Sequence, residues 1–122
     1  MLYNYYTLAV QQWCSSSNMI HGLWPDINRT SYPEFCPGTP FDLELLRGSD
    51  RYTEIAKYWV DCTQAETDSL YEHEWAKHGT CVAAMTGFSQ NEYFEKALEL
   101  YYNNTSGGCY DLKFEPFDCS RI

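Results

Sequence analysis

The 122-residue chain lacks any long uninterrupted run of apolar residues, so we expect no segment that spans a membrane. Its first residues, MLYNYY, also lack the basic start and long apolar stretch of a signal peptide, and we interpret them as a mature end with an initiating methionine. Internal repeats and low-complexity stretches are missing as well. With 44% hydrophobic and 17% aromatic residues, the chain is expected to fold as one domain over residues 1–122.

Basic residues are scarce: eight Lys and Arg stand against 17 Asp and Glu, which gives a formal net charge of −9. Such a chain lacks the broad positive surface with which tight nucleic-acid binders neutralise phosphates. A polyanionic substrate would therefore need a local cationic site. The three histidines can build one, because protonating all of them would change the net charge from −9 to −6.

The six cysteines include no Cys-x-x-Cys pair, which argues against a zinc site and for three disulfides formed in an oxidising compartment. Composition alone leaves open how these residues pair: Cys14, Cys36, Cys62, Cys81, Cys109 and Cys119. Glycosylation sequons at Asn28, Asn103 and Asn104 agree with a secretory route. We therefore expect a protein that is secreted or held in a lysosome or vacuole.

The hydrophobic pattern predicts an α+β fold, in which a compact antiparallel sheet packs with several helices. Residues 5–13 alternate in polarity and are rich in β-branched and aromatic side chains, so we expect a core strand there. A second strand is expected over residues 19–25, and two short strands over residues 109–119 close the fold.

Four helices are expected from the 3.6-residue spacing of apolar side chains and from capping signals. Their expected limits are residues 40–46, 51–60, 68–79 and 90–102. Thr39 is the expected N-cap of the first helix and Gly79 the C-cap of the third. Ser89 and Glu92 form a capping box at the start of the fourth.

The stretch EHEWAKHGTC, residues 72–81, holds two of the three histidines. On a helix, Glu74 and His78 are one turn apart and Lys77 lies on the same face, so a carboxylate, an imidazole and a permanent cation can meet. The zinc motif H-E-x-x-H is not matched, because the five-residue spacing of His73 and His78 turns the second ring away on an α-helix. We therefore expect no metal site. An ordinary solvated helix face is the alternative interpretation.

The stretch IHGLWPD, residues 20–26, holds the third histidine. Gly22 after His21 leaves room for a ligand against the backbone, and Trp24 offers a flat ring on which a base or a sugar can stack. In the alternative interpretation, Trp24 belongs to the core and His21 is a buried histidine whose hydrogen bonds are satisfied.

Together the two stretches resemble the paired active-site motifs of the ribonuclease T2 family, and the likeness extends through QQW, SYPEFC, PFDL and CYDLKFEPFDC. The resemblance implies a ribonuclease T2-like, disulfide-stabilised fold and an endoribonuclease that needs neither a metal nor another cofactor. Its substrate would be single-stranded RNA, cleaved at acidic pH by attack of the ribose 2′-OH on phosphorus, with a 2′,3′-cyclic phosphate as product. We expect a monomer without membrane attachment, and the sequence does not indicate a protein partner.

By this resemblance, His21 and His78 are the acid–base pair. We assign His78 to take the 2′-OH proton and His21 to protonate the leaving 5′-oxygen, and the reverse assignment stays open. His73 matches a phosphate-binding position, while Glu74 and Lys77 match positions that stabilise the transition state. Glu74 is also expected to hold a neighbouring imidazolium in its charged form at low pH.

The resemblance further implies where bases bind and which cysteines pair. Base-contacting positions are matched by Gln12, Trp24, Asp26 and Tyr32, from which we expect weak base specificity with a bias to purines. The implied disulfides are Cys36–Cys81, Cys109–Cys119 and Cys14–Cys62. The chain is shorter than usual members of the family between residue 104 and the final GGCYDLKF segment, so a smaller sheet or an open sheet edge is expected.

Two other functions are alternatives to the ribonuclease. One is a secreted binding or effector protein on the same fold, in which cleavage is lost or secondary. The other is a disulfide-rich carbohydrate-binding module, suggested by the 11 Tyr and 4 Trp. Glycan binding should survive His21→Ala or His78→Ala, whereas RNA cleavage should not.

Overall fold

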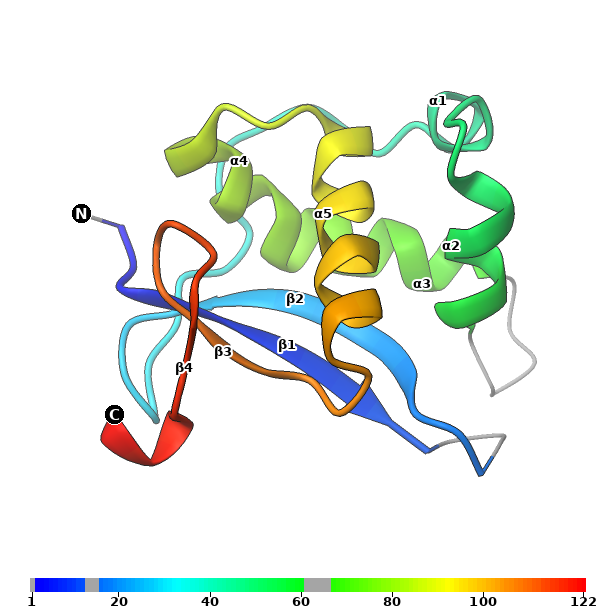
Figure 1. Cartoon of the computed structure of the whole chain (residues 1–122). Coiled ribbons are helices and arrows are strands. Elements are labelled where there is room, and N and C mark those ends of the chain that lie inside the picture. The colour runs from blue at the N-terminus through cyan, green and yellow to red at the C-terminus, as the bar shows by residue number, and fades with distance from the viewer. Residues whose placement is uncertain (1, 13–15, 61–66) are drawn as a thin grey trace.

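A four-stranded antiparallel sheet with helices over one face forms the framework (Figure 1). The computed structural model describes residues 2–12, 16–60 and 67–122. The strands lie in the order β2-β1-β3-β4. Their limits are Tyr5–Gln11 for β1, Met19–Asp26 for β2, Gly108–Tyr110 for β3 and Pro116–Phe117 for β4. The expected α+β class, including the two short closing strands, is confirmed.

The helices include one long path that changes its helical type midway. This path consists of α3, η1 and α4, where η1 is a π-helix. Another helix, α5, runs from the top of the helical layer down to the sheet (Figure 1). The helical limits are Leu43–Arg47 for α1, Tyr52–Tyr58 for α2, Thr67–Glu74 for α3, Trp75–Gly79 for η1, Thr80–Thr86 for α4, Gln90–Asn103 for α5 and Cys119–Arg121 for the 3₁₀-helix η2. Within the described ranges, no helix has the length and apolar character needed to cross a bilayer.

The start of α1 differs from the expectation that Thr39 caps it. Asp42 is the N-cap, and its carboxylate accepts a hydrogen bond from the backbone N–H of Leu45 at 3.2 Å. The carbonyl of Thr39 instead accepts the indole N–H of Trp75 at 2.8 Å. The chain before Asp42 is thus held against η1, and the helix begins only after it leaves that contact.

The expectation that a helix ends at Gly79 is wrong. Gly79 keeps right-handed helical angles, with φ −63° and ψ −38°, and the helical path continues to Thr86. It ends at Gly87, which adopts a left-handed φ of 78°. A Cβ at Gly79 would overlap the ring of Trp75, so this glycine serves close packing rather than helix termination.

The hydrophobic core lies between the sheet and the helices. Tyr6 and Leu8 of β1 are buried there, on the face expected from the alternation of the first strand. Phe94 on α5 packs against the rings of Trp59 and Tyr71. The capping box of α5 is confirmed: the hydroxyl of Ser89 accepts from the Glu92 backbone N–H, and the Glu92 carboxylate accepts from the Ser89 backbone N–H. Local capping and core packing therefore fix α5 over the sheet.

Two of the three expected disulfides are confirmed. Cys36–Cys81 ties the loop after β2 to α4, and Cys109–Cys119 ties β3 to η2. The expected pair Cys14–Cys62 lies outside the described residues. The loop after β2 has a second attachment, because the backbone N–H of Phe35 donates a hydrogen bond to the carbonyl of Lys77 at 2.9 Å. The loop after β2 is therefore held directly on η1.

Candidate active site

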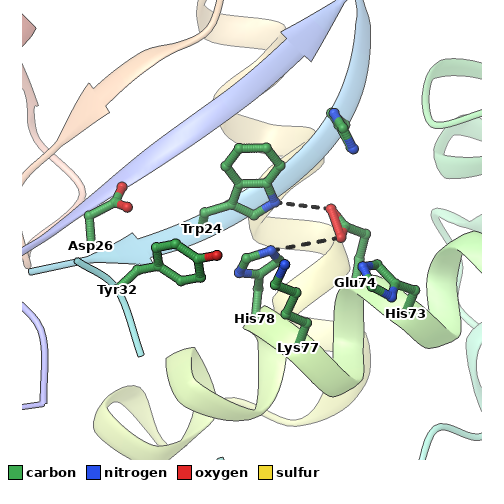
Figure 2. Close-up of a pocket in the computed structure, with 8 residues that line it drawn as sticks. Trp24, Asp26, Tyr32, His73, Glu74, Lys77 and His78 are labelled. Carbon is green, nitrogen blue, oxygen red and sulfur yellow. Dashed lines mark hydrogen bonds and ion pairs between the residues drawn. The ribbon is translucent and has the colours of Figure 1, made fainter. Parts of the chain in front are cut away.

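A pocket of about 270 Å³ opens between β2, the loop that follows it and the α3–η1 path (Figure 2). It is lined by His21, Trp24, Asp26, Tyr32, His73, Glu74, Lys77 and His78. These are the site residues expected from the sequence, apart from Gln12. Gln12 instead lines a separate hollow together with Lys57 and Tyr101. The structure thus brings both motifs into one pocket and leaves Gln12 out of it.

A β-bulge delivers His21 to this pocket. Strand β1 pairs Ala9 with Gly22 and Val10 with Ile20, so His21 is an extra residue in the ladder. Ile20 and Leu23 are both buried in the core although regular alternation would place them on opposite faces. The bulge lets both contribute to the core while His21 points elsewhere and lines the pocket.

The π-helix η1 has the matching effect on the second motif. A π-helical turn bonds residue i to i+5, so side chains five positions apart come onto one side. His73 and His78 have this spacing, and both line the pocket. The expectation that the second ring turns away, which assumed an α-helix, is therefore wrong. Among the residues described, no three or more His, Cys, Asp or Glu are arranged to hold a metal ion.

Trp24 of the first motif contacts Glu74 and His78 of the second (Figure 2). Its indole N–H donates to Glu74 Oε1 at 3.0 Å, and Glu74 Oε2 lies 4.0 Å from Nε2 of His78. The ring of Trp24 stacks on His78 with centroids 5.1 Å apart and meets His21 edge-on, also at 5.1 Å. The space beside Gly22, expected to admit a ligand, is filled by Trp24 and Glu74.

Burial makes Glu74 and His78 neutral over the acid range. Glu74 is only 1% exposed, and this burial raises its pKa to about 7, with the Trp24 hydrogen bond and the charge of Lys77 opposing the rise. His78 is 5% exposed; burial lowers its pKa to about 3, and nearby Lys77 adds to the effect. The expectation that Glu74 holds an imidazolium in its charged form is therefore wrong for the unliganded pocket.

The pKa of His21 is shifted in the same direction as that of His78. Burial lowers it below the ordinary value of 6.5, and the charge of His73 lowers it further. His21 is only partly buried. Its protonated form is thus populated mainly below the usual histidine range.

Lys77 supplies a cation at the mouth of the pocket. Its ammonium group lies 5.6 Å from the ring centroid of Tyr32 and 3.9 Å from Oε2 of Glu34. Tyr32 is 45% exposed, and its ring is tilted against His78 at 6.2 Å. An incoming anion would therefore meet Lys77 and Tyr32 together. Glu34 was missed at the sequence level because nothing in SYPEFC shows that its carboxylate faces Lys77.

Asp26 lies at the other end of the pocket lining and is held by a residue that the sequence did not single out. Its Oδ2 accepts a hydrogen bond from the hydroxyl of Thr7 at 2.6 Å. Burial raises the pKa of Asp26, and this hydrogen bond works against the rise. Thr7 is the cross-strand partner of Trp24 in the β1–β2 ladder. Only the strand pairing brings Thr7 beside Trp24 and Asp26 of the stretch IHGLWPD, so no local signal could have found it.

The fold and the pocket define an α+β domain with three imidazoles, two carboxyl groups and a lysine ammonium group in one site. The sequence model of the Ribonuclease T2 family matches residues 4–109. Because this span is most of the chain, the protein belongs to the ribonuclease T2 family.

Individual relatives agree with this assignment. Human Ribonuclease T2 is 41% identical over 86 residues, which cover 67% of this chain and 31% of the human protein. Extracellular ribonuclease LE of Solanum lycopersicum is 38% identical over 84 residues, or 66% of this chain and 35% of the tomato protein. A mutant of RNase MC1 from bitter gourd, solved with 5′-UMP, is 27% identical with a TM-score of 0.70, and the match covers 91% of this chain and 60% of that one. The chain thus spans about a third of the length of these curated relatives.

Proposed function

We propose that this chain is an endoribonuclease that cleaves single-stranded RNA by transphosphorylation and leaves a 2′,3′-cyclic phosphate. The observation that carries the proposal is the meeting of two imidazoles from separate elements, His21 from the bulge in β2 and His78 from η1, which both line the pocket and both contact the ring of Trp24. Cyclisation needs a base for the attacking 2′-OH and an acid for the departing 5′-oxygen. Two imidazoles in one pocket can supply both.

His78 suits the role of the base. Burial lowers the pKa of its imidazole to about 3. The ring is therefore neutral above that pH and keeps a free lone pair with which to accept a proton. A phosphodiester entering the pocket adds negative charge beside the ring, which raises the pKa of the imidazole in the complex and makes it a stronger base. His78 then takes the 2′-OH proton as the oxygen attacks phosphorus.

His21 suits the role of the acid. It must carry a proton to give one to the 5′-oxygen, and its lowered pKa makes that form abundant only at acidic pH. Cleavage should therefore rise as the pH falls below the usual histidine range and decline again once the base is protonated. This gives a bell-shaped profile on the acid side of neutrality.

The remaining polar groups suit the charge that develops on the phosphoryl oxygens. Lys77, a permanent cation at the pocket mouth, can stabilise the pentacovalent oxyanion, and His73 can bind the phosphate. Glu74, neutral below its pKa of about 7, can donate a hydrogen bond to a phosphoryl oxygen. Asp26 and Tyr32 are left to contact a base, and one carboxylate with one exposed ring supports only weak base specificity.

The same reasoning extends to the setting in which the enzyme acts. We propose a secreted, lysosomal or vacuolar location, supported by the two disulfides of the described part of the chain and by the extracellular relative from tomato. An acidic compartment would also match the protonation that His21 requires.

The test is cleavage of single-stranded RNA from pH 4 to 8 with EDTA present. Wild type is compared with His78→Ala and with Arg47→Ala, a change in an exposed ion pair outside the pocket. We expect EDTA-resistant cleavage that peaks below neutrality, persists in Arg47→Ala and falls by about 10²-fold or more in His78→Ala. Folded wild type that cleaves at no pH, or His78→Ala that cleaves like wild type, would overturn the proposal.

A further inference from the structure

We infer that Trp24 has a positioning role beyond any contact with a base: its indole N–H holds Glu74 so that the neutral carboxyl group carries its proton on Oε2, the oxygen nearer to His78. The effect of this arrangement on cleavage rests on the proposed function. The arrangement itself can be measured without RNA.

The hydrogen bond decides which oxygen is protonated. An indole N–H can only donate, so Oε1 of Glu74, 3.0 Å from Trp24 Nε1, must act as the acceptor. A proton on Oε1 would compete with the indole hydrogen for the same space. The carboxyl proton therefore belongs on Oε2, which lies 4.0 Å from His78 Nε2. That separation exceeds a direct hydrogen bond, so the O–H is free to turn toward an oxygen that enters the pocket.

Gly22 makes this contact possible. A Cβ at this position would overlap both Oε1 of Glu74 and Nε1 of Trp24, the two atoms that form the hydrogen bond. The backbone of β2 thus approaches the donor and the acceptor together. Any larger residue at position 22 would have to separate them.

The groups around Glu74 leave its carboxyl group neutral at acidic pH. On its own helical path, Lys77 lowers the pKa of Glu74, and His78 is itself neutral because of burial. From α5, Tyr93 faces Glu74 but keeps its hydroxyl proton, which it donates to the carbonyl of Leu23 at 2.8 Å.

The other two histidines of the pocket, His21 and His73, also face this region. Burial outweighs all of these charges and raises the pKa of Glu74 to about 7. A protonated carboxyl group is therefore available across the range in which the enzyme is proposed to act.

The consequence for the reaction is a directed hydrogen-bond donor. Oε1 accepts the hydrogen bond from Trp24, so the hydroxyl group at Oε2 is the remaining polar group of the carboxyl. It can donate a hydrogen bond to a phosphoryl oxygen as that oxygen gains negative charge. No proton needs to leave Glu74. Without the indole N–H, the carboxyl group can rotate or carry its proton on either oxygen.

Nuclear magnetic resonance of the wild-type protein gives the first test. We expect the indole N–H resonance of Trp24 to shift with pH along the same curve as the ¹³C-labelled carboxyl carbon of Glu74, and to stop titrating in Glu74→Gln. The indole N–H of Trp75 donates to a backbone carbonyl, that of Thr39, and is the matched control without this titration. A Trp24 resonance that does not follow Glu74 would overturn the inference.

Kinetics of Trp24→Phe give the second test. Loss of the N–H should lower kcat and change the pH dependence of kcat, whereas a residue that only stacks on a base would change KM alone. Gly22→Ala, which keeps the indole but crowds the hydrogen bond, should change the pH dependence of kcat in the same way. If Trp24→Phe raises KM with an unchanged kcat profile, the positioning role is refuted. If wild type does not cleave RNA although Trp24 follows Glu74, the proposed function fails and the hydrogen-bond arrangement stands.

Discussion

At the scale of single residues, Thr7 sets the state of Asp26, the carboxyl group proposed to contact a base. The Thr7 hydroxyl occupies Oδ2 of Asp26 and lowers a pKa that burial raises. With one oxygen held, only the other is free to accept a hydrogen bond from a base. The orientation of Asp26 therefore depends on a side chain from the neighbouring strand.

Replacing Thr7 by Val should weaken discrimination between bases. The variant removes the hydrogen bond, so the pKa of Asp26 rises and the carboxyl group loses its fixed orientation. We expect the ratio of kcat/KM for adenosine- over uridine-containing dinucleotides to fall toward 1, by about 3-fold, because a hydrogen bond to a charged group contributes ~1.5–3 kcal/mol, only part of it is lost and the starting preference is weak. Thr53→Val, at an exposed position on α2, is the control. An unchanged ratio in Thr7→Val would show that Asp26 does not need this support.

At the scale of elements, the sequence predicts well what is encoded locally. The capping box of Ser89 and Glu92 lies within one turn, and the structure has it where expected. Glu74, Lys77 and His78 are likewise close in sequence, so their meeting could be foreseen. Interactions within a turn depend on few other residues, which is why local patterns identify them.

The two features that complete the pocket could not be predicted in this way. The bulge at His21 exists only in the pairing of β2 with β1, and it depends on which residues of both strands enter the core. The π-helical turn from Trp75 to Gly79 depends on packing against other elements and has no periodic signature over five residues. Gly79 was misinterpreted for the same reason: a glycine needed for close packing looks the same in sequence as one needed for a left-handed turn.

Gly79→Ala should therefore destabilise the protein although alanine favours helices. The added Cβ would overlap the ring of Trp75 and crowd Tyr93 at 3.1 Å, and overpacking of this kind costs about 1–3 kcal/mol. The gain in helix propensity is at most about 1 kcal/mol. Urea unfolding should show a lower unfolding free energy for the variant.

Gly48→Ala provides the matched comparison. Gly48 has right-handed helical backbone angles. A Cβ added there would have the carbonyl oxygen of Leu45 as its nearest neighbour, at 3.4 Å. Its unfolding free energy should stay within about 0.5 kcal/mol of wild type. Equal effects at both glycines would contradict the packing argument for Gly79.

At the scale of the whole molecule, Glu74 and His78 give stability opposite dependences on pH. The pKa of Glu74 is raised from 4.5 to about 7, so its stabilising contribution is complete below pH 4.5 and is lost as the pH rises through 7. The pKa of His78 is lowered from 6.5 to about 3, so its contribution is complete above pH 6.5 and is lost as the pH falls through 3. Between pH 4.5 and 6.5 the two slopes oppose each other, and stability should be nearly flat.

Glu74→Gln should remove one of these slopes. The amide never ionises, so the variant should gain stability relative to wild type between pH 5 and pH 8, by an amount of the order of 3 kcal/mol if the full shift applies. Urea unfolding of both proteins at the two pH values measures this difference. Glu44→Gln changes a side chain that is 81% exposed. Its unfolding free energy should differ from that of wild type by the same amount at both pH values. A pH-independent difference for Glu74→Gln would mean that the buried carboxyl group does not titrate as described.

The bulge in β2 means that activity could be lost during evolution while the fold is kept. Removing the codon for His21 would leave Ile20 opposite Val10 and Gly22 opposite Ala9 as consecutive pairs, which is an unbroken antiparallel ladder. Ile20 and Leu23 would then fall on the same face by ordinary alternation, with the core intact. The proposed acid is thus carried as an insertion that the sheet does not need, and a single in-frame deletion would yield a descendant with a more regular sheet and no such imidazole.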